Sequence, residues 1–139
     1  MRHLRAARRE DLARIWEIRN GVRENRLTDP DAVTDEDVLW YIDQAVFLVA
    51  EVDGVIVGFA SGDHLNAWLF ALFVDPAHEG QGHGRALHDA VLARLAEIGH
   101  RQAWLSTDPG TRAAGFYAAA GWHETGRQAD GQSVFVKSL

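Results

Sequence analysis

The sequence predicts an α+β (α/β) domain in which a mixed sheet of about seven strands is flanked by four helices. The apolar residues form short strand-like runs and longer stretches with helical spacing, in the order β-α-α-β-β-β-α-β-α-β-β. An Asp53-Gly54 pair separates two of the strand-like runs, and alternating glycines follow an almost wholly apolar run. With 139 residues, the chain is expected to form one domain, residues 1–139.

The composition argues against several classes of function. The formal charge is −6, whereas nucleic-acid-binding proteins usually present a basic face. The chain has no cysteine, which excludes disulfides, thiolate metal sites and cysteine nucleophiles. The N-terminal residues are charged, and no run approaches the ~18 apolar residues that span a membrane. We therefore expect no signal peptide, no membrane partner and no nucleic-acid partner, and we place the protein in the cytoplasm.

In the N-terminal half, the predicted strands are residues 2–7, 46–52, 55–62 and 67–74. An amphipathic helix is predicted over residues 11–22, where one stripe is formed by Leu12, Ile15, Trp16 and Arg19. Thr34 begins a second helix, because Thr34 and Asp37 have the spacing of a capping box. Residues 67–74 are almost entirely apolar, which predicts a central strand buried on both faces.

In the C-terminal half, a third helix follows the glycines and ends near Gly99. A short fourth helix carries apolar and aromatic residues at 113–120 and stops at Gly121. The remaining predicted strands are residues 102–107, 122–126 and 133–139, the last two forming a hairpin.

The segment HEGQGHGRAL, residues 78–87, predicts a phosphate-binding loop. Gly80, Gly82 and Gly84 lack Cβ atoms, so consecutive backbone N–H groups can converge on an anion at the N-terminus of the next helix. The dinucleotide-binding pattern G-x-G-x-x-G fails because Arg85 occupies its last position, and the Walker pattern fails because no Lys-Ser or Lys-Thr pair follows. NAD, ATP and GTP are therefore poor candidates.

Two segments resemble motifs of the GNAT superfamily of acyl-CoA-dependent N-acetyltransferases. LFVDPAHEGQGHGRAL (72–87) is similar to the family's central motif, with Gly82 and Gly84 at its two small-residue positions, and TRAAGFYAAAGW (111–122) resembles its second motif. Two positions depart from the family pattern. Glu79 stands where Gln or Arg is usual, and Gly110 stands where an Asn often contacts the pantetheine arm of the cofactor.

The resemblance implies a GNAT-like, mostly antiparallel sheet and acetyl-CoA as cosubstrate, with no metal. It implies that the backbone of Leu72, Phe73 and Val74 holds the pantetheine arm, with the oxyanion contact from Phe73 or Val74. It also implies that residues 80–85 surround the pyrophosphate: Gly80, Gln81, Gly82, His83, Gly84 and Arg85. His78, His83 and His88 recur every five residues, but successive side chains then face different directions on a helix, so a metal site is not expected.

Two catalytic residues are predicted. Tyr117 matches the tyrosine that often protonates the departing CoA thiolate, although a core aromatic would show the same spacing. The general base is less defined, because the family's strand glutamate is absent from WLST. Glu24 is the first choice, because in the family the polar segment between the first two helices borders the acceptor site. Asp63, His64, Asp108 or a water chain remain alternatives.

The predicted function is acetyl transfer from acetyl-CoA to a primary amine of a small molecule, by direct transfer; a homodimer is compatible with it. The alternatives are a non-catalytic acyl-CoA-binding or sensory module of the same fold, and a structural domain whose glycines form only a turn. The stretch from Arg19 to Asp35 mixes both signs of charge, which favours an amino-acid-like or zwitterionic acceptor over a polyamine.

Overall fold

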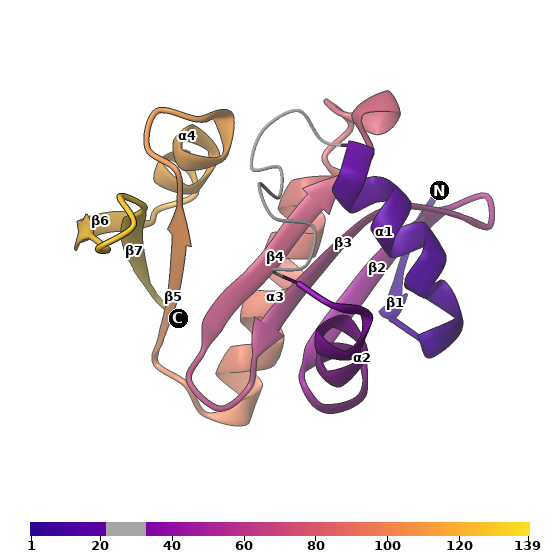
Figure 1. Ribbon diagram of the computed structural model, residues 1–139, viewed down its shortest axis with the longest axis horizontal. Coiled ribbons are helices and arrows are strands. Elements are labelled where there is room, and N and C mark those ends of the chain that lie inside the picture. The colour runs from indigo at the N-terminus through magenta and orange to yellow at the C-terminus, as the bar shows by residue number, and fades with distance from the viewer. Residues whose placement is uncertain (22–32) are drawn as a thin grey trace.

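Seven strands form one sheet in the computed structural model, which describes residues 1–21 and 33–139 (Figure 1). The strands are β1 (Arg2–Ala6), β2 (Val46–Val52), β3 (Val55–Asp63), β4 (Trp68–Val74), β5 (Gln102–Thr107), β6 (His123–Arg127) and β7 (Ser133–Ser138). Their order across the sheet is β1-β2-β3-β4-β5-β7-β6. Neighbouring strands are antiparallel except β4 and β5, which are parallel. The predicted mixed, mostly antiparallel sheet is confirmed.

Helices cover both faces of this sheet within the described ranges. They are α1 (Leu12–Gly21), α2 (Asp35–Gln44), α3 (His83–Ile98) and α4 (Arg112–Ala119), with 3-10 turns η1 (Arg9–Asp11) and η2 (Pro76–His78). Helices α1 and α2 lie on one face and α3 on the other (Figure 1). Alternate residues of β2 enter the two cores: Leu48 and Ala50 pack with α3, whereas Phe47 and Val49 pack with α1 and α2. The unbroken apolar run of β2 follows from this burial on both faces.

Local signals in the sequence fix several boundaries. Asp53 and Gly54 both have positive φ (52° and 80°), as a tight hairpin between β2 and β3 requires. Thr34 caps α2 as predicted: its hydroxyl accepts from Asp37 N at 3.2 Å, and the Asp37 carboxylate accepts from Thr34 N at 2.9 Å. No helix of the described residues is long and apolar enough to cross a bilayer.

Two predicted details are corrected. The first helix does not begin at Asp11 as an α-helix, because Asp11 closes the 3-10 turn η1 and α1 starts at Leu12. The strand predicted at 67–74 is central in the sheet, but it is not buried on both faces. Most of β4 is only partly buried and Phe70 is 38% exposed, because β5 pairs with β4 at one residue and then diverges from it.

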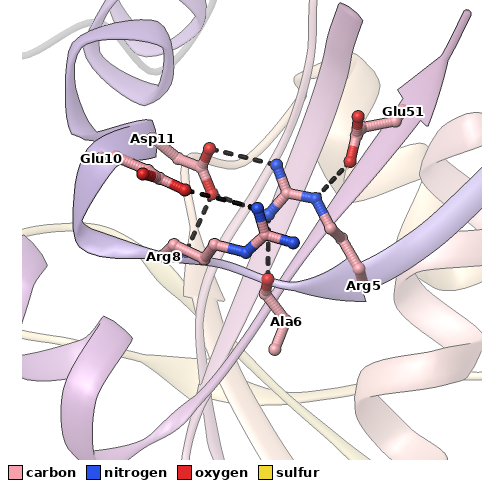
Figure 2. Close-up of polar contacts among 6 residues, drawn as sticks. All are labelled: Arg5, Ala6, Arg8, Glu10, Asp11 and Glu51. Atoms are coloured by element: carbon pink, nitrogen blue, oxygen red, sulfur yellow. Dashed lines mark hydrogen bonds and ion pairs between the residues drawn. The ribbon is translucent and has the colours of Figure 1, made fainter. Parts of the chain in front are cut away.

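A cluster around Arg5 joins β1, β2 and the start of α1 (Figure 2). The Arg5 guanidinium forms a two-pronged contact with Asp11, with Nη1–Oδ2 at 2.8 Å and Nη2–Oδ1 at 3.1 Å, and Nε donates to Glu51. The backbone N–H of Arg8 also donates to Asp11 at 2.8 Å. These hydrogen bonds, above all those from Arg5, hold the pKa of Asp11 below its ordinary value. The buried Asp11 carboxylate therefore fixes where α1 begins relative to the sheet.

We expect Asp11→Asn to lower the free energy of unfolding by about 2–4 kcal/mol at neutral pH, because it leaves the Arg5 guanidinium partly buried beside a neutral amide. Urea unfolding followed by circular dichroism measures this loss. Glu10→Gln is the matched control: Glu10 pairs with Arg8 in a contact whose side chains are 70% and 62% exposed, so its loss should cost about 0.5 kcal/mol or less. Equal effects of the two substitutions would contradict the role of Asp11.

Candidate functional site

The sheet opens between β4 and β5. These strands pair at one position, Trp68 with Trp104, and the Trp104 N–H also donates to the carbonyl of Ala67 at 2.9 Å. Beyond this point β4 remains paired with β3, and β5 remains paired with β7 along its whole length. The facing edges of the two strands therefore diverge, as Figure 1 shows, and beyond Trp68 and Trp104 their backbone groups on these edges pair with no strand of residues 1–21 and 33–139.

A cavity of about 350 Å³ occupies this opening. One wall is β4 with the end of α1, and the other is the second half of β5 with α4. The lining residues in the described ranges are Arg19, Val33, Trp68, Leu69, Phe70, Ala71, Leu72, Phe73, Leu105, Ser106, Thr107, Tyr117 and Gln132. Leu72, Phe73 and Tyr117 were predicted as site residues, whereas the polar group of Ser106, Thr107 and Gln132 was not.

The glycine loop leads from η2 into α3. Gly80 and Gly82 have left-handed backbone conformations, with φ of +75° and +84°, and Gly82 is the N-cap of α3. The first intrahelical bond runs from Ala86 N to Gly82 O, so the earlier N–H groups of this turn have no helical acceptor. Gly84 differs, because it lies inside the helix without a positive φ and a Cβ there would meet Val74 at an ordinary 3.5 Å. The expectation that Gly84 needs the freedom of glycine is therefore not supported by the geometry.

Arg2 of β1 holds the loop in place from 81 residues away. Its Nε donates to His83 Nδ1 at 2.9 Å, and its Nη2 donates to the carbonyl of Gln81 at 3.0 Å. Because His83 Nδ1 accepts this hydrogen bond, Nε2 carries the ring hydrogen and donates it to the Gln81 side-chain oxygen at 3.1 Å. Burial, with the charges of Arg2 and His78, lowers the pKa of His83. The His83 ring thus stiffens the loop, and no local sequence signal predicted the contribution of Arg2.

The two departures from the family pattern have simple structural counterparts. The Glu79 carboxylate accepts a hydrogen bond from Arg112 of α4 at 3.2 Å, so its charge is offset locally. Gly110 precedes α4 with φ of +77°, a backbone conformation that Gly and Asn adopt more readily than other residues. Arg85, a predicted cofactor-binding residue, pairs with Asp89 one turn further along α3 at 3.0 Å.

Tyr117 projects from α4 into the cavity wall. The residue is 7% exposed, and its burial raises the pKa of the phenol. The ring packs edge-on against Phe116 and Trp122, with centroids 5.3 and 5.8 Å away, so its position is fixed on two sides. Tyr117 is therefore both a core aromatic and a cavity residue, and the two interpretations of the sequence are compatible.

His88 lies beneath this aromatic group and is 1% exposed. The indole Nε1 of Trp122 donates to His88 Nε2 at 2.9 Å, and His88 Nδ1 lies 2.8 Å from the Asp89 carboxylate. An indole nitrogen can only donate, so His88 Nε2 is unprotonated and Nδ1 carries the hydrogen. Burial lowers the pKa of His88 more than the contact with Asp89 raises it. His88 is thus a neutral structural side chain.

Of the candidate bases, those in the described residues, Asp63, His64 and Asp108, do not line the cavity. Glu24 lies outside the described residues. Asp63 accepts from Leu65 N in a turn, His64 lines a separate cavity beside α3, and Asp108 contacts the lining residue Gln132 only at 3.5 Å. In the described ranges, no group of three or more His, Cys, Asp or Glu side chains could hold a metal ion.

The chain matches known acetyltransferases. A profile of the Acetyltransferase (GNAT) family matches residues 9–122. The L-2,4-diaminobutyric acid acetyltransferase of Nocardia farcinica is 32% identical over 140 aligned residues, which cover 95% of this chain and 69% of that protein. The mycothiol acetyltransferase of Sanguibacter keddieii is 34% identical over 116 residues, 71% of this chain and 34% of that protein. This chain thus spans about a third of the length of the second relative.

Solved structures share the fold at low sequence identity. The PaiA N-acetyltransferase of Thermoplasma acidophilum, in complex with coenzyme A, superposes with a TM-score of 0.85 at 16% identity, covering 100% of this chain and 99% of that one. The yncA protein of Salmonella typhimurium, solved with its cofactor acetyl-CoA, gives 0.81 at 20% identity, covering 100% and 94%.

The sheet, the family match and the curated relatives together define the class of the protein. The chain belongs to the GNAT family of acetyltransferases, and it is an enzyme of the acyltransferase class.

The neutral state of His88 predicts acid sensitivity. Its folded-state pKa lies below the unfolded value near 6.5, so below that pH the unfolded chain binds the extra proton and stability falls. We expect the free energy of unfolding to drop below pH 6.5 by up to about 1.4 kcal/mol per pH unit from this group. The charges around the ring are those of Asp89, Arg85 and Lys137.

Urea unfolding between pH 5 and 8 measures this slope. His88→Gln should flatten it while lowering overall stability, whereas His123→Gln, at an exposed position on β6, should leave it unchanged. A wild-type slope that His88→Gln does not alter would contradict the assignment.

Proposed function

We propose that the chain transfers an acetyl group from acetyl-CoA to the primary amine of a small molecule. The observation that carries this proposal is the opening between β4 and β5. It is a cavity with Tyr117 in one wall and, in the other, an edge of β4 that pairs beyond Trp68 with no strand of the described residues. The names of the two curated relatives, acetyltransferases of diaminobutyric acid and of mycothiol, support a small-molecule acceptor. Because one sheet runs through the described residues, we propose that residues 1–139 act as one catalytic unit.

The backbone is proposed to bind acetyl-CoA. Leu72, Phe73 and Val74 would hold the pantetheine arm along the open edge of β4, as an added strand does. The pyrophosphate would lie against the backbone N–H groups of Gly80, Gln81, Gly82, His83, Gly84 and Arg85. The loop fits this task, because a Cβ built at Gly80 meets nothing within 4 Å and the N-terminus of α3 attracts anions. Local amides can thus bind a polyanion although the chain carries a net charge of −6.

The chemical step needs an oxyanion donor and a proton for the departing sulfur. A backbone N–H of Phe73 or Val74 would polarise the thioester carbonyl. As the amine nitrogen bonds to the acetyl carbon and the C–S bond breaks, Tyr117 would donate its proton to sulfur and regain one from the nitrogen. The Tyr117 phenol is protonated at neutral pH, as a donor must be, because its ordinary pKa is near 10 and burial raises it further. No cysteine is present to form a thioester with the protein, which favours direct transfer.

The acceptor must first lose the proton of its ammonium form. We propose Glu24 for this step, from the segment between α1 and α2. Asp63 and His64, at the far end of β3, and Asp108, after β5, are less suitable because none of them lines the cavity.

Binding of the cosubstrate is tested at the glycine loop. Gly82→Ala should weaken CoA binding about 10-fold, because a left-handed alanine costs roughly 1–2 kcal/mol and the free loop would relax away from the binding conformation. Gly84→Ala is the matched control and should stay within about 3-fold of the parent, because Gly84 has helical backbone. Calorimetric titration with CoA measures both. Equal affinities in all three proteins would mean that the loop is only a turn.

Turnover is tested at Tyr117. With acetyl-CoA and a panel of small primary amines, the wild-type protein should release CoA, and Tyr117→Phe should reduce kcat by roughly 10²- to 10⁴-fold with little change in KM for acetyl-CoA. Tyr41→Phe removes a hydroxyl from the chain's other tyrosine, on α2, and should leave kcat unchanged. If acetyl-CoA raises the melting temperature but no amine releases CoA, the chain is a binding module and the proposed reaction is wrong.

A further inference from the structure

Arg19 is a partly buried cation that lacks a full set of hydrogen-bond partners among the described residues. It lies in the last turn of α1, and its Cζ is 4.3 Å from the centroid of the Phe73 ring on β4. Its Nη1 atom is buried and has no hydrogen-bond acceptor within residues 1–21 and 33–139. The Phe73 ring attracts the charge but leaves the Nη1 hydrogens without an acceptor.

Arg14, on the same helix, shows what a purely structural arginine looks like here. Its Nε donates to the carbonyl of Ile56 at 2.9 Å, and its Nη2 donates to Asp75 at 2.8 Å, which ties α1 to the end of β4. Arg19 has no such carboxylate among the residues that the structure describes. A buried guanidinium N–H that lacks an acceptor costs free energy, and a ligand that supplies an acceptor removes this cost on binding.

The position of Arg19 is between two cavities. It lines the β4–β5 cavity that contains Tyr117, and it also lines an apolar cavity of about 120 Å³ bounded by α1, α2 and the sheet. Phe70, Ala71 and Phe73 belong to both linings, so the cavities adjoin. Among the described residues that line either cavity, Arg19 is the one charged side chain. An acceptor entering here meets a positive group beside an apolar surface.

We propose that Arg19 binds a carboxylate of the acceptor, so that the substrate class is amines that also carry a carboxylate, such as amino acids. The planar guanidinium can hold a carboxylate with two parallel hydrogen bonds, which fixes direction as well as position. Phe73 links this contact to the reaction, because its side chain packs on Arg19 and its backbone belongs to the proposed oxyanion site. This inference rests on the proposed acetyl transfer and names its acceptor.

The experiment compares amino acids with their decarboxylated counterparts: serine with ethanolamine, ornithine with putrescine, and lysine with cadaverine. For at least one pair, the wild-type kcat/KM should favour the carboxylated member by roughly 10- to 100-fold, the contribution of a charge-assisted hydrogen bond. Arg19→Gln should lower kcat/KM for the carboxylated member at least 10-fold more than for the decarboxylated member, so that the preference is lost, and KM for acetyl-CoA should not be the parameter that changes most. Arg19→Lys should retain part of the preference.

Arg94→Gln is the control, because Arg94 is 56% exposed on α3, away from both cavities. Calorimetry on the CoA-loaded protein gives a readout that needs no turnover: binding of the carboxylated member should weaken at least 10-fold in Arg19→Gln. Binding that depends on Arg19 without any acetylation would overturn the proposed reaction and retain this inference.

Three results would overturn the inference itself. The first is equal loss of activity on both members of a pair, which would mean that Arg19 only packs against Phe73. The second is a raised KM for acetyl-CoA as the main effect, which would place Arg19 against the cosubstrate. The third is a wild-type protein that prefers, or binds, only the decarboxylated amines.

Discussion

The pairing of β4 with β5 at one position, Trp68 with Trp104, determines the shape of the site. Ala67 takes a left-handed conformation, with φ of +58°, while almost fully buried, and its carbonyl accepts the Trp104 N–H. A strained alanine costs roughly 1–2 kcal/mol, so this geometry is held by its surroundings rather than preferred by the chain. Beyond this position, β4 stays hydrogen-bonded to β3 and β5 stays hydrogen-bonded to β7, so the two strands separate. The bulge at Phe70, where Ser61 pairs with Ala71 and Gly62 with Leu69, increases the bend of β4. The cleft is thus a property of the whole sheet.

Three arginines hold the parts around this cleft, and two of them, Arg2 and Arg14, do so through partners distant in sequence. Arg5 fixes the start of α1, Arg14 joins α1 to Asp75 at the end of β4, and Arg2 steadies the glycine loop through His83. The hydrogen bond from Arg14, with that from the Ala77 N–H, also lowers the pKa of Asp75. The loop is therefore positioned from two sides before any ligand arrives, which reduces the conformational entropy that binding must overcome.

The sequence predicted best what depends on neighbouring residues. The Asp53-Gly54 turn, the Thr34 cap and the glycines that end helices, Gly99 and Gly121, all express backbone preferences within a few residues, and the structure confirms them. The exposure of β4 was not predictable from its apolar pattern, because the pattern does not show that β5 pairs with it at one residue only. The contact of Arg2 with His83 and the neutral tautomer of His88, set by Trp122, join residues far apart in the chain and were also missed. The role of Glu24 stays a prediction, since it lies outside the described residues.

The burial of Tyr117 has a consequence for selectivity in the proposed reaction. A phenol whose pKa is raised by burial gives up a proton only if another proton replaces it at nearly the same time. The amine nitrogen can supply that proton when it is aligned with the acetyl carbon, whereas a disordered water in the cleft cannot do so from a fixed position. An acceptor held by Arg19 on one side of β4 would be aligned in this way, with Tyr117 facing it across the cavity. Binding of the acceptor and protonation of the leaving group would then be coupled, so that acetyl-CoA reacts with the amine rather than with water.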